Sequence, residues 1–339
     1  MRLEGELVRK TSGGQLVAKK SNLSSMKGKR RQRRPDCMPS VVQQLFDTCK
    51  AVFAEGTAGF IPPPEDVFRI RSILDRLKPE DVGLSPKLPY FKNIDARRPS
   101  PITYLHVYAC DEFSIGIFCL PPNAVIPLHN HPGMTVFSKI FFGSMHIKSY
   151  DWVVVSQDSI EPCRVVLPSG ERLAKVKTDA VFTAPCETSI LYPSSGGNMH
   201  CFTAKTACAF LDVLGPPYSS PERNCTYYFD HAYAKYAGNP DSLIMAKADG
   251  YDDAVKTPEH VKEEVGLLAD HIPNSRGSTD ADARAVDGKA KSISEVLSGM
   301  SPLDLGEGEG YGWLQERTGQ PEEFLVVGAK YRGHNIVED

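Results

Sequence analysis

Hydrophobic residues recur at helical spacing near the start of the chain. Over residues 39–55 they fall on one stripe of an amphipathic helix. The stripe consists of Val42, Leu45, Phe46, Cys49, Val52 and Phe53. Three prolines at 62–64 then break the chain, and Pro64-Glu-Asp predicts the start of a second helix. The apolar positions of this second helix are Val67, Ile70, Ile73 and Leu74.

From about residue 100 the pattern changes to short apolar runs separated by Gly, Pro and Asn. Such runs, without a helical pattern between them, predict a mainly β fold, either a sandwich or a barrel. The expected strands are 103–109, 113–120, 125–131, 135–153, 163–167, 172–184, 188–193, 198–204 and 207–214. The first two helices would then pack outside this β structure.

The remaining segments are polar and divide the chain further. Residues 1–36 should be a disordered basic tail, and 252–310 a flexible acidic insertion rich in Asp, Glu, Ser, Gly and Ala. Between them, 37–251 should form the main domain. The segment 311–339 regains apolar residues, so we expect it to dock back on the barrel.

Charge separates the tail from the rest of the chain. Residues 1–36 carry 11 Lys/Arg and 3 Asp/Glu, whereas the whole chain of 339 residues has a net charge of −3. The basic run 27–34 predicts nuclear import; the alternative is a solvated tail that binds nucleic acid loosely. We expect the protein in nucleus and cytoplasm, with no specific nucleic-acid site.

The nine cysteines are odd in number and form no Cys-x-x-Cys pair. Together with the absence of an apolar secretory segment, this predicts reduced thiols in the cytosol or nucleus and argues against a structural zinc site. No apolar run is long enough to cross a bilayer, so we expect no membrane association.

Candidate chemistry is concentrated in residues 127–133, where His129 and His131 are separated by one residue. In an extended strand these two imidazoles point to the same face and suit one metal ion. His200 is a third candidate ligand. Histidine ligands suit iron, zinc, copper or nickel. The alternative, buried structural histidines, explains the pairing beside Pro and Gly less well.

The pattern of Gly116, His129, His131, Gly143 and His200 resembles the two motifs of the cupin family. The resemblance implies a double-stranded β-helix, a jelly-roll barrel. Where cupins commonly place a glutamate ligand, this chain has Thr135 or Val136. A three-histidine set is the feature of the thiol dioxygenases, and it leaves the full charge of a divalent metal available to an anionic thiolate.

Residues 127–139 and 143–152 resemble the plant cysteine oxidases, which are similar to the animal cysteamine dioxygenase. Segments 42–50 and 224–229 and the region around Trp313 also match. The resemblance implies an Fe(II) enzyme that uses O2 to oxidise an N-terminal cysteine to cysteine sulfinic acid. The implied substrates are group VII ethylene-response transcription factors, which oxidation marks for the N-degron pathway in hypoxia sensing.

Two further residues are candidates for a catalytic role. Asp212 lies in the apolar run 207–214, where a carboxylate is costly unless it has a partner. We expect it to contact the substrate amine or to orient a ligand histidine; a structural hydrogen bond is the alternative. Tyr218 could line the substrate entrance or simply pack. Cys225 and Tyr227 match a crosslinked pair of the animal relative, but we do not expect the crosslink here.

Two rival functions remain open at this point. One is a dioxygenase of small thiols such as cysteamine or free cysteine, and the other is a non-catalytic metal-binding cupin. Retention of all three histidines argues against the second rival. We expect the protein to be a monomer.

Overall fold

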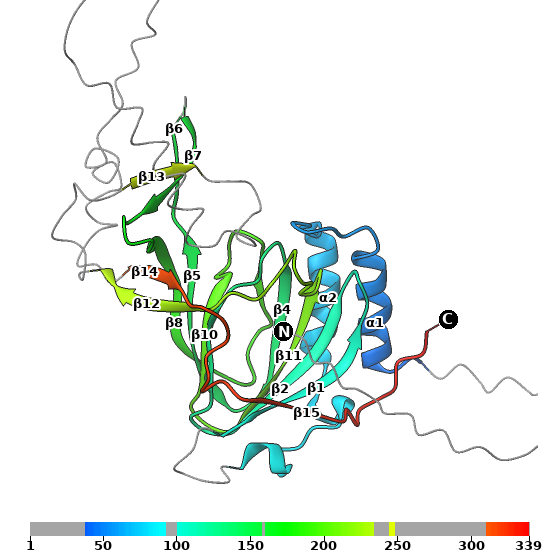
Figure 1. Ribbon diagram of the computed structural model, residues 1–339. Coiled ribbons are helices and arrows are strands. Elements are labelled where there is room, and N and C mark those ends of the chain that lie inside the picture. Colours follow the sequence, from blue (N-terminus) through cyan, green and yellow to red (C-terminus); the bar gives the residue numbers. More distant parts are fainter. Residues whose placement is uncertain (1–37, 93–99, 158–159, 234–243, 248–309, 339) are drawn as a thin grey trace, which may run out of the picture. The chain divides into compact units, whose positions relative to one another are not determined.

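The computed structural model describes residues 38–92, 100–157, 160–233, 244–247 and 310–338 (Figure 1). The predictions for residues 1–36 and 252–309 lie outside these described residues. The helices are α1 (Val41–Val52) and α2 (Pro64–Arg76), followed by the 3₁₀ turns η1 (Pro79–Val82) and η2 (Pro89–Phe91). All of these elements belong to the unit Ser40–Asp339.

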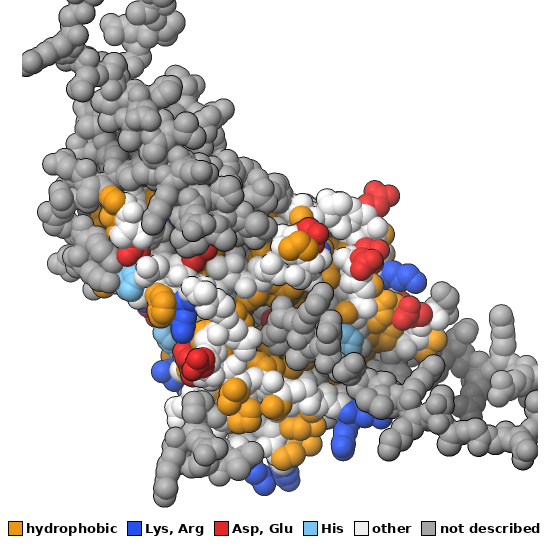
Figure 2. Space-filling view, viewed as in Figure 1, with side chains coloured by type: hydrophobic (Ala, Val, Ile, Leu, Met, Phe, Trp, Pro, Cys, Tyr) orange, Lys and Arg blue, Asp and Glu red, His pale blue; other side chains and the backbone are white. Residues whose placement is uncertain are grey.

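The described surface is mixed in character. On the face shown in Figure 2, Lys, Arg, Asp and Glu side chains are scattered among apolar ones and do not gather into a patch of one sign.

Among the described helices, none combines the length and apolarity that a bilayer crossing requires.

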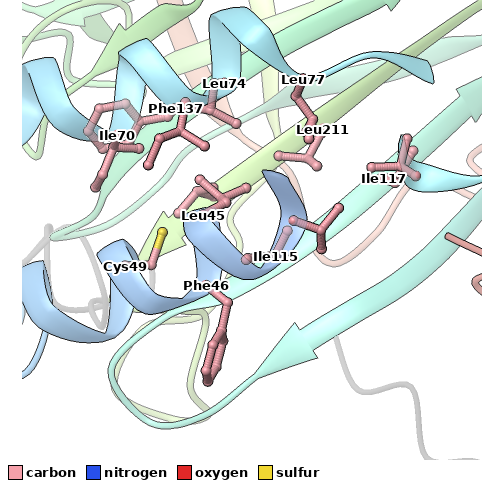
Figure 3. Packing of buried hydrophobic residues seen from close by; sticks show 14 of the residues in the cluster. Leu45, Phe46, Cys49, Ile70, Leu74, Leu77, Ile115, Ile117, Phe137 and Leu211 are labelled. Carbon is pink, nitrogen blue, oxygen red and sulfur yellow. The ribbon is translucent and has the colours of Figure 1, made fainter. Parts of the chain in front are cut away.

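Helix α1 forms where the sequence predicts it. The Ser40 side chain accepts a hydrogen bond from the Gln43 N–H at 3.1 Å, which caps the first turn. The stripe of Val42, Leu45, Phe46, Cys49 and Val52 is buried. Figure 3 shows Leu45, Phe46 and Cys49 of this stripe among buried apolar residues of α2 and of the strands.

Helix α2 begins at Pro64, whose missing N–H costs nothing in a first helical turn. It buries Ile70, Ile73 and Leu74, whereas Val67 is only partly buried. Its Asp75 carboxylate binds the buried Lys139 ammonium at 3.2 Å and the Thr188 hydroxyl at 2.7 Å. These contacts fasten α2 to the β structure.

Strands are the main regular element of the described chain. Its strands are β1 (Ile102–Ala109), β2 (Ser114–Leu120), β3 (Val125–His129), β4 (Thr135–Phe142), β5 (Ser144–Trp152), β6 (Val154–Gln157), β7 (Ile160–Val166), β8 (Arg172–Thr183), β9 (Ser189–Leu191), β10 (Met199–Ala204), β11 (Cys208–Gly215), β12 (Tyr228–Ala232), β13 (Ile244–Lys247), β14 (Tyr311–Glu316) and β15 (Val326–Ala329). The predicted mainly β fold with two N-terminal helices is confirmed.

The longest predicted strand is divided in the structure. The run 135–153 forms two strands, β4 and β5, because the chain turns at Gly143 with φ +83°. A side chain at this position would collide with the backbone of Ala207. Only glycine combines this backbone conformation with the close approach.

Two sheets result. The first has the order β15-β1-β2-β11-β4-β9, and β15 joins β1 in parallel with Ile102 opposite Val326. The main path of the second is β12-β14-β8-β5-β10-β3. Its two ends meet, because His129 at the end of β3 forms a bridge with Tyr227 next to β12. The second sheet therefore curls back on itself around the end of β3.

The two faces of the first sheet have different partners. On the outer face, Ile115, Ile117, Phe137 and Leu211 belong to one apolar cluster with the residues of α1 and α2 (Figure 3). The inner face alternates with it and packs Phe210 and Ile140 against Phe202 of the second sheet. The helices thus support the sheet from outside, and the inner face remains for the candidate site.

Candidate metal centre

Two of the three candidate histidines are delivered by paired strands. Strands β3 and β10 are antiparallel, and His129 lies directly opposite His200 in their register. Directly opposed residues in such a pair carry their side chains on the same face. The two ring centroids lie 4.8 Å apart, and both residues are buried.

His131 reaches the same point from outside the strand. The prediction that a strand continues to residue 131 is wrong, because β3 ends at His129 and the chain turns at Pro132-Gly133. The His131 ring nevertheless lies 5.0 Å from that of His129 and 4.8 Å from that of His200, centroid to centroid. The three histidines predicted as ligands therefore form one nearly equilateral cluster.

The tautomers of the first two histidines follow from their partners. The His129 Nδ1 lies 2.8 Å from the Pro127 carbonyl oxygen, which can only accept. The Tyr218 hydroxyl donates to the Asn130 carbonyl at 2.7 Å, so its oxygen accepts from the His131 Nδ1 at 3.0 Å. Both rings thus carry their proton on Nδ1, which leaves the Nε2 lone pair free for a metal.

The His200 ring completes the same arrangement. It is hydrogen-bonded to the backbone of Gly197, while its Nε2 faces the Nε2 of His131 at 3.1 Å. Two imidazole nitrogens bound to one metal at about 2.1 Å and at right angles would be about 3.0 Å apart. The facing lone pairs fit a shared cation.

Burial keeps these rings neutral, as metal ligands must be. It lowers the pKa of His129 to about 4. The pKa values of His131 and His200 also lie well below the ordinary range, because of burial and then because of the neighbouring histidines. Among the described residues, a group suited to hold a metal consists of His129, His131 and His200, without a carboxylate.

The position where cupins commonly place a glutamate has a different role here. The Thr135 hydroxyl donates to the Phe60 carbonyl at 2.8 Å and ties the site to the loop between α1 and α2. Val136 packs in an apolar cluster with Met134, Leu191 and Leu214. Neither side chain belongs to the cluster of His129, His131 and His200.

Tyr218 contacts a candidate ligand, a role that the sequence did not indicate. Burial raises its pKa well above the ordinary 10, so the hydroxyl keeps the proton that it donates to Asn130. The Cys225 thiol is hydrogen-bonded to the hydroxyls of Tyr218 and Tyr227, and it is a free cysteine. The predicted role of Tyr218 at the substrate entrance stays a prediction.

Asp212 lies on the inner face of the first sheet, in β11. Its carboxylate is buried and accepts a hydrogen bond from the Ser138 hydroxyl at 2.6 Å across the β11–β4 pair. Burial raises its pKa to about 7, although the bond from Ser138 acts in the opposite direction. Its negative charge also contributes to the raised pKa of Tyr218, so the two side chains interact electrostatically.

Two buried asparagines of the site were not among the predicted residues. Asn130 lies between two of the histidines: its Nδ2 donates to the Tyr228 hydroxyl at 3.2 Å, and its Oδ1 accepts from the Thr226 N–H at 2.8 Å. Asn198 precedes His200 by two residues and is 5% exposed. The signal in the sequence is an asparagine beside each histidine segment, but its partners lie far along the chain.

Comparison with known proteins places this arrangement in a family. The family model PCO_ADO matches residues 73–265. The chain is 44% identical to plant cysteine oxidase 2 of Arabidopsis thaliana over 338 residues, covering 99% of this chain and 97% of that protein. It is 46% identical to plant cysteine oxidase 1 of the same plant, with 88% and 80% covered. The chain belongs to the PCO_ADO family.

The predicted resemblance to plant cysteine oxidases is thereby confirmed. The match to human 2-aminoethanethiol dioxygenase is weaker, 32% identical over 49% of this chain and 65% of that one. The region matched by the PCO_ADO model contains His129, His131, His200, Asp212 and Tyr218. Both helix α1 and strand β15 lie outside that region.

Proposed function

We propose that the protein is an Fe(II)-dependent thiol dioxygenase that acts on an N-terminal cysteine. The reaction adds both atoms of O2 to the thiol, R–SH + O2 → R–SO2H, so that no other reductant is needed. The observation that carries the proposal is the triad His129, His131 and His200, with convergent Nε2 atoms in a relative of the cysteine oxidases.

The donor set favours iron and an anionic substrate group. Imidazole suits divalent iron, and three neutral rings leave the charge of the ion uncompensated. Bound Fe(II) would supply a binding position for the thiolate and a means to activate O2. The protein's own contribution is to hold the three rings and to keep bulk water from the buried site.

The residues around the triad orient its rings. Pro127 and Tyr218 hold His129 and His131 in the Nδ1–H tautomer. Because the Tyr218 proton is committed to the Asn130 carbonyl, this tyrosine acts on the metal ligand as an acceptor. We propose that this is its principal role, and that replacing it with Phe weakens metal binding as well as turnover.

Asp212 is proposed to bind the substrate ammonium. A free α-amino group has a pKa of about 7.7–8.0 and is largely protonated at neutral pH. The buried Asp212 carboxylate accepts one hydrogen bond from the Ser138 hydroxyl, and its two oxygens together have the capacity for a further, cationic donor. Arrival of an ammonium would offset the burial cost and favour the ionised carboxylate.

Peptide oxidation tests the proposal directly. Full-length protein loaded with Fe(II) is incubated with a cysteine-initiated peptide in air and under nitrogen, and products are read by mass spectrometry. We expect a gain of two oxygen atoms in air only. Zinc-loaded protein and a peptide with an acetylated N-terminus are the matched controls, and both should give no product.

The same assay separates the rival substrates. Faster oxidation of cysteamine or free cysteine than of the peptide would assign the enzyme to small thiols, the activity class named for its more distant relatives. Failure to oxidise any of these thiols, with iron bound, would leave a non-catalytic metal-binding protein.

We further propose that the peptide substrates are group VII ethylene-response transcription factors and that oxidation serves oxygen sensing through the N-degron pathway. The support is the close similarity to two plant cysteine oxidases. Peptides with the N-terminal sequences of these factors should be oxidised faster than peptides that share only the first cysteine. Equal rates would remove the assignment.

Nuclear import by the basic run 27–34 is a separate proposal. It rests on six Lys/Arg within eight residues. Replacing these six residues by Gln in a fluorescent fusion should lower the ratio of nuclear to cytoplasmic signal. An unchanged ratio would show that the run is not an import signal.

A further inference from the structure

The side chain of Asn198 stands where a strand pairing would otherwise continue. In the β3–β10 register His129 lies opposite His200, so the next pair on the same face would be His131 opposite Asn198. Neither residue belongs to a strand, because β3 ends at His129 and β10 begins at Met199. The backbone ladder therefore ends before it reaches the third ligand.

Asn198 makes the missing bonds with its side-chain amide. The His131 N–H donates to the Asn198 Oδ1 at 3.1 Å, and the Asn198 Nδ2 donates to the His131 carbonyl at 2.9 Å. In a hydrogen-bonded pair of an antiparallel ladder, the backbone of the opposite residue would make these two bonds. The Nδ2 also donates to the Tyr192 carbonyl at 2.9 Å, which fixes the orientation of the amide.

The other edge of β10 ends in the same way. Its ladder with β5 stops at Met199 opposite Tyr150, so the next pair would be Asn198 opposite Asp151. Here the Asp151 Oδ1 accepts from the N–H groups of Gly197 and Asn198, at 2.8 and 3.1 Å. Gly197 has φ +86° and approaches Ser149 too closely for a side chain.

A row of side-chain contacts, Asp151–Asn198–His131, thus runs beside the backbone row Ser149–His200–His129. The backbone row places two ligands by strand pairing. The third ligand, His131, depends on the side-chain row for its place relative to His200. Asn198 is buried, so water does not replace its bonds without opening the site.

We infer that Asn198 is a positioning residue that sets the separation of His131 and His200, and that Asp151 holds Asn198 in place. The inference rests on the proposed metal site but not on the substrate or the reaction. Asn198 and Asp151 should therefore affect metal affinity and coordination geometry beyond any effect that they have on folding.

Cobalt binding by the full-length protein tests the inference, because Co(II) reports coordination through its visible absorption and needs no turnover. Affinity is measured by competition with a chelator, and the unfolding midpoint is measured without metal. We expect Asn198→Ala to bind Co(II) about tenfold more weakly or worse and to change the absorption bands. Asn198→Asp keeps the acceptor but loses both donors, and should also bind more weakly.

Thr188→Ala is the matched control, since Thr188 is a buried residue whose side chain binds Asp75 of α2 and not the metal site. Its midpoint should fall about as far as that of Asn198→Ala, with cobalt affinity and spectrum unchanged. Asp151→Asn retains an acceptor oxygen and should keep most of the affinity that Asp151→Ala loses.

Two results would overturn the inference. One is wild-type affinity and spectrum in both Asn198 variants, and the other is an equal loss of affinity in Thr188→Ala. If Asn198→Ala does not fold, Asn198→Asp and the Asp151 pair carry the comparison. Wild-type protein that binds cobalt normally but oxidises no thiol would refute the proposed function and leave this inference intact.

Discussion

Asp212→Asn should abolish one specific dependence of stability on pH. In the folded protein burial raises the carboxyl pKa from its ordinary 3.8 to about 7. Between about pH 4 and pH 7 the folded state therefore holds this proton more tightly than the unfolded chain. The free energy of unfolding falls as pH rises through that window, and this group contributes no further change above about pH 8.

The magnitude follows from the size of the pKa change. A rise of about three pKa units at 1.36 kcal/mol each gives about 4 kcal/mol, an upper limit for one buried group. The amide of the Asp212→Asn variant has no such proton, but its side-chain oxygen can still accept from the Ser138 hydroxyl. The difference in unfolding free energy between variant and wild type should therefore grow by up to this amount from pH 4 to pH 8.

Denaturant unfolding of metal-free protein at several pH values measures this difference. Because Ser138 donates to the carboxylate and lowers its pKa, Ser138→Ala should move the window to higher pH. Bound divalent metal should have the opposite effect, since a nearby positive charge favours ionisation. A difference between Asp212→Asn and wild type that stays constant with pH would refute the reasoning and indicate that folding does not shift the pKa of Asp212.

Three further changes have defined outcomes. His200→Ala removes one of three ligands, so elemental analysis should find most of the iron lost; full iron content would exclude His200. Leu45→Ala leaves a cavity between α1 and the first sheet and should cost about 2–5 kcal/mol in chemical denaturation, against less than about 0.5 kcal/mol for the exposed Glu55→Ala. Gly143→Ala forces a side chain against Ala207 and should lower the thermal midpoint; an unchanged midpoint would mean the β4–β5 turn adapts.

The helices and most strands could be predicted because their apolar residues repeat with a local period. The stripe of α1 is contained within twelve residues, and the apolar runs of β2 and β11 within seven and eight. The paired histidines could also be identified locally, since a single residue separates His129 from His131. Local periodicity also hides a turn, and this is why the sequence of 135–153 predicts one strand where the structure has two.

The remaining features depend on contacts between distant segments. Tyr218 meets His131 across 87 positions, and Asn198 meets it across 67. No local pattern distinguishes an asparagine that replaces a strand pairing from one that faces water. The parallel pairing of β15 with β1 is equally invisible, because four residues of strand carry no indication of their partner.

That parallel pairing has a consequence for how the protein is made. Among the described strands, β1 is the first to leave the ribosome, whereas its neighbour β15 is the last. At a synthesis rate of about 5–20 residues per second, Val326 is added on the order of ten to forty seconds after its partner Ile102. During this interval one edge of β1 offers unpaired backbone groups to any other nascent chain. Chaperone demand during synthesis should therefore concentrate on this edge, long after the strands that carry the histidines have emerged.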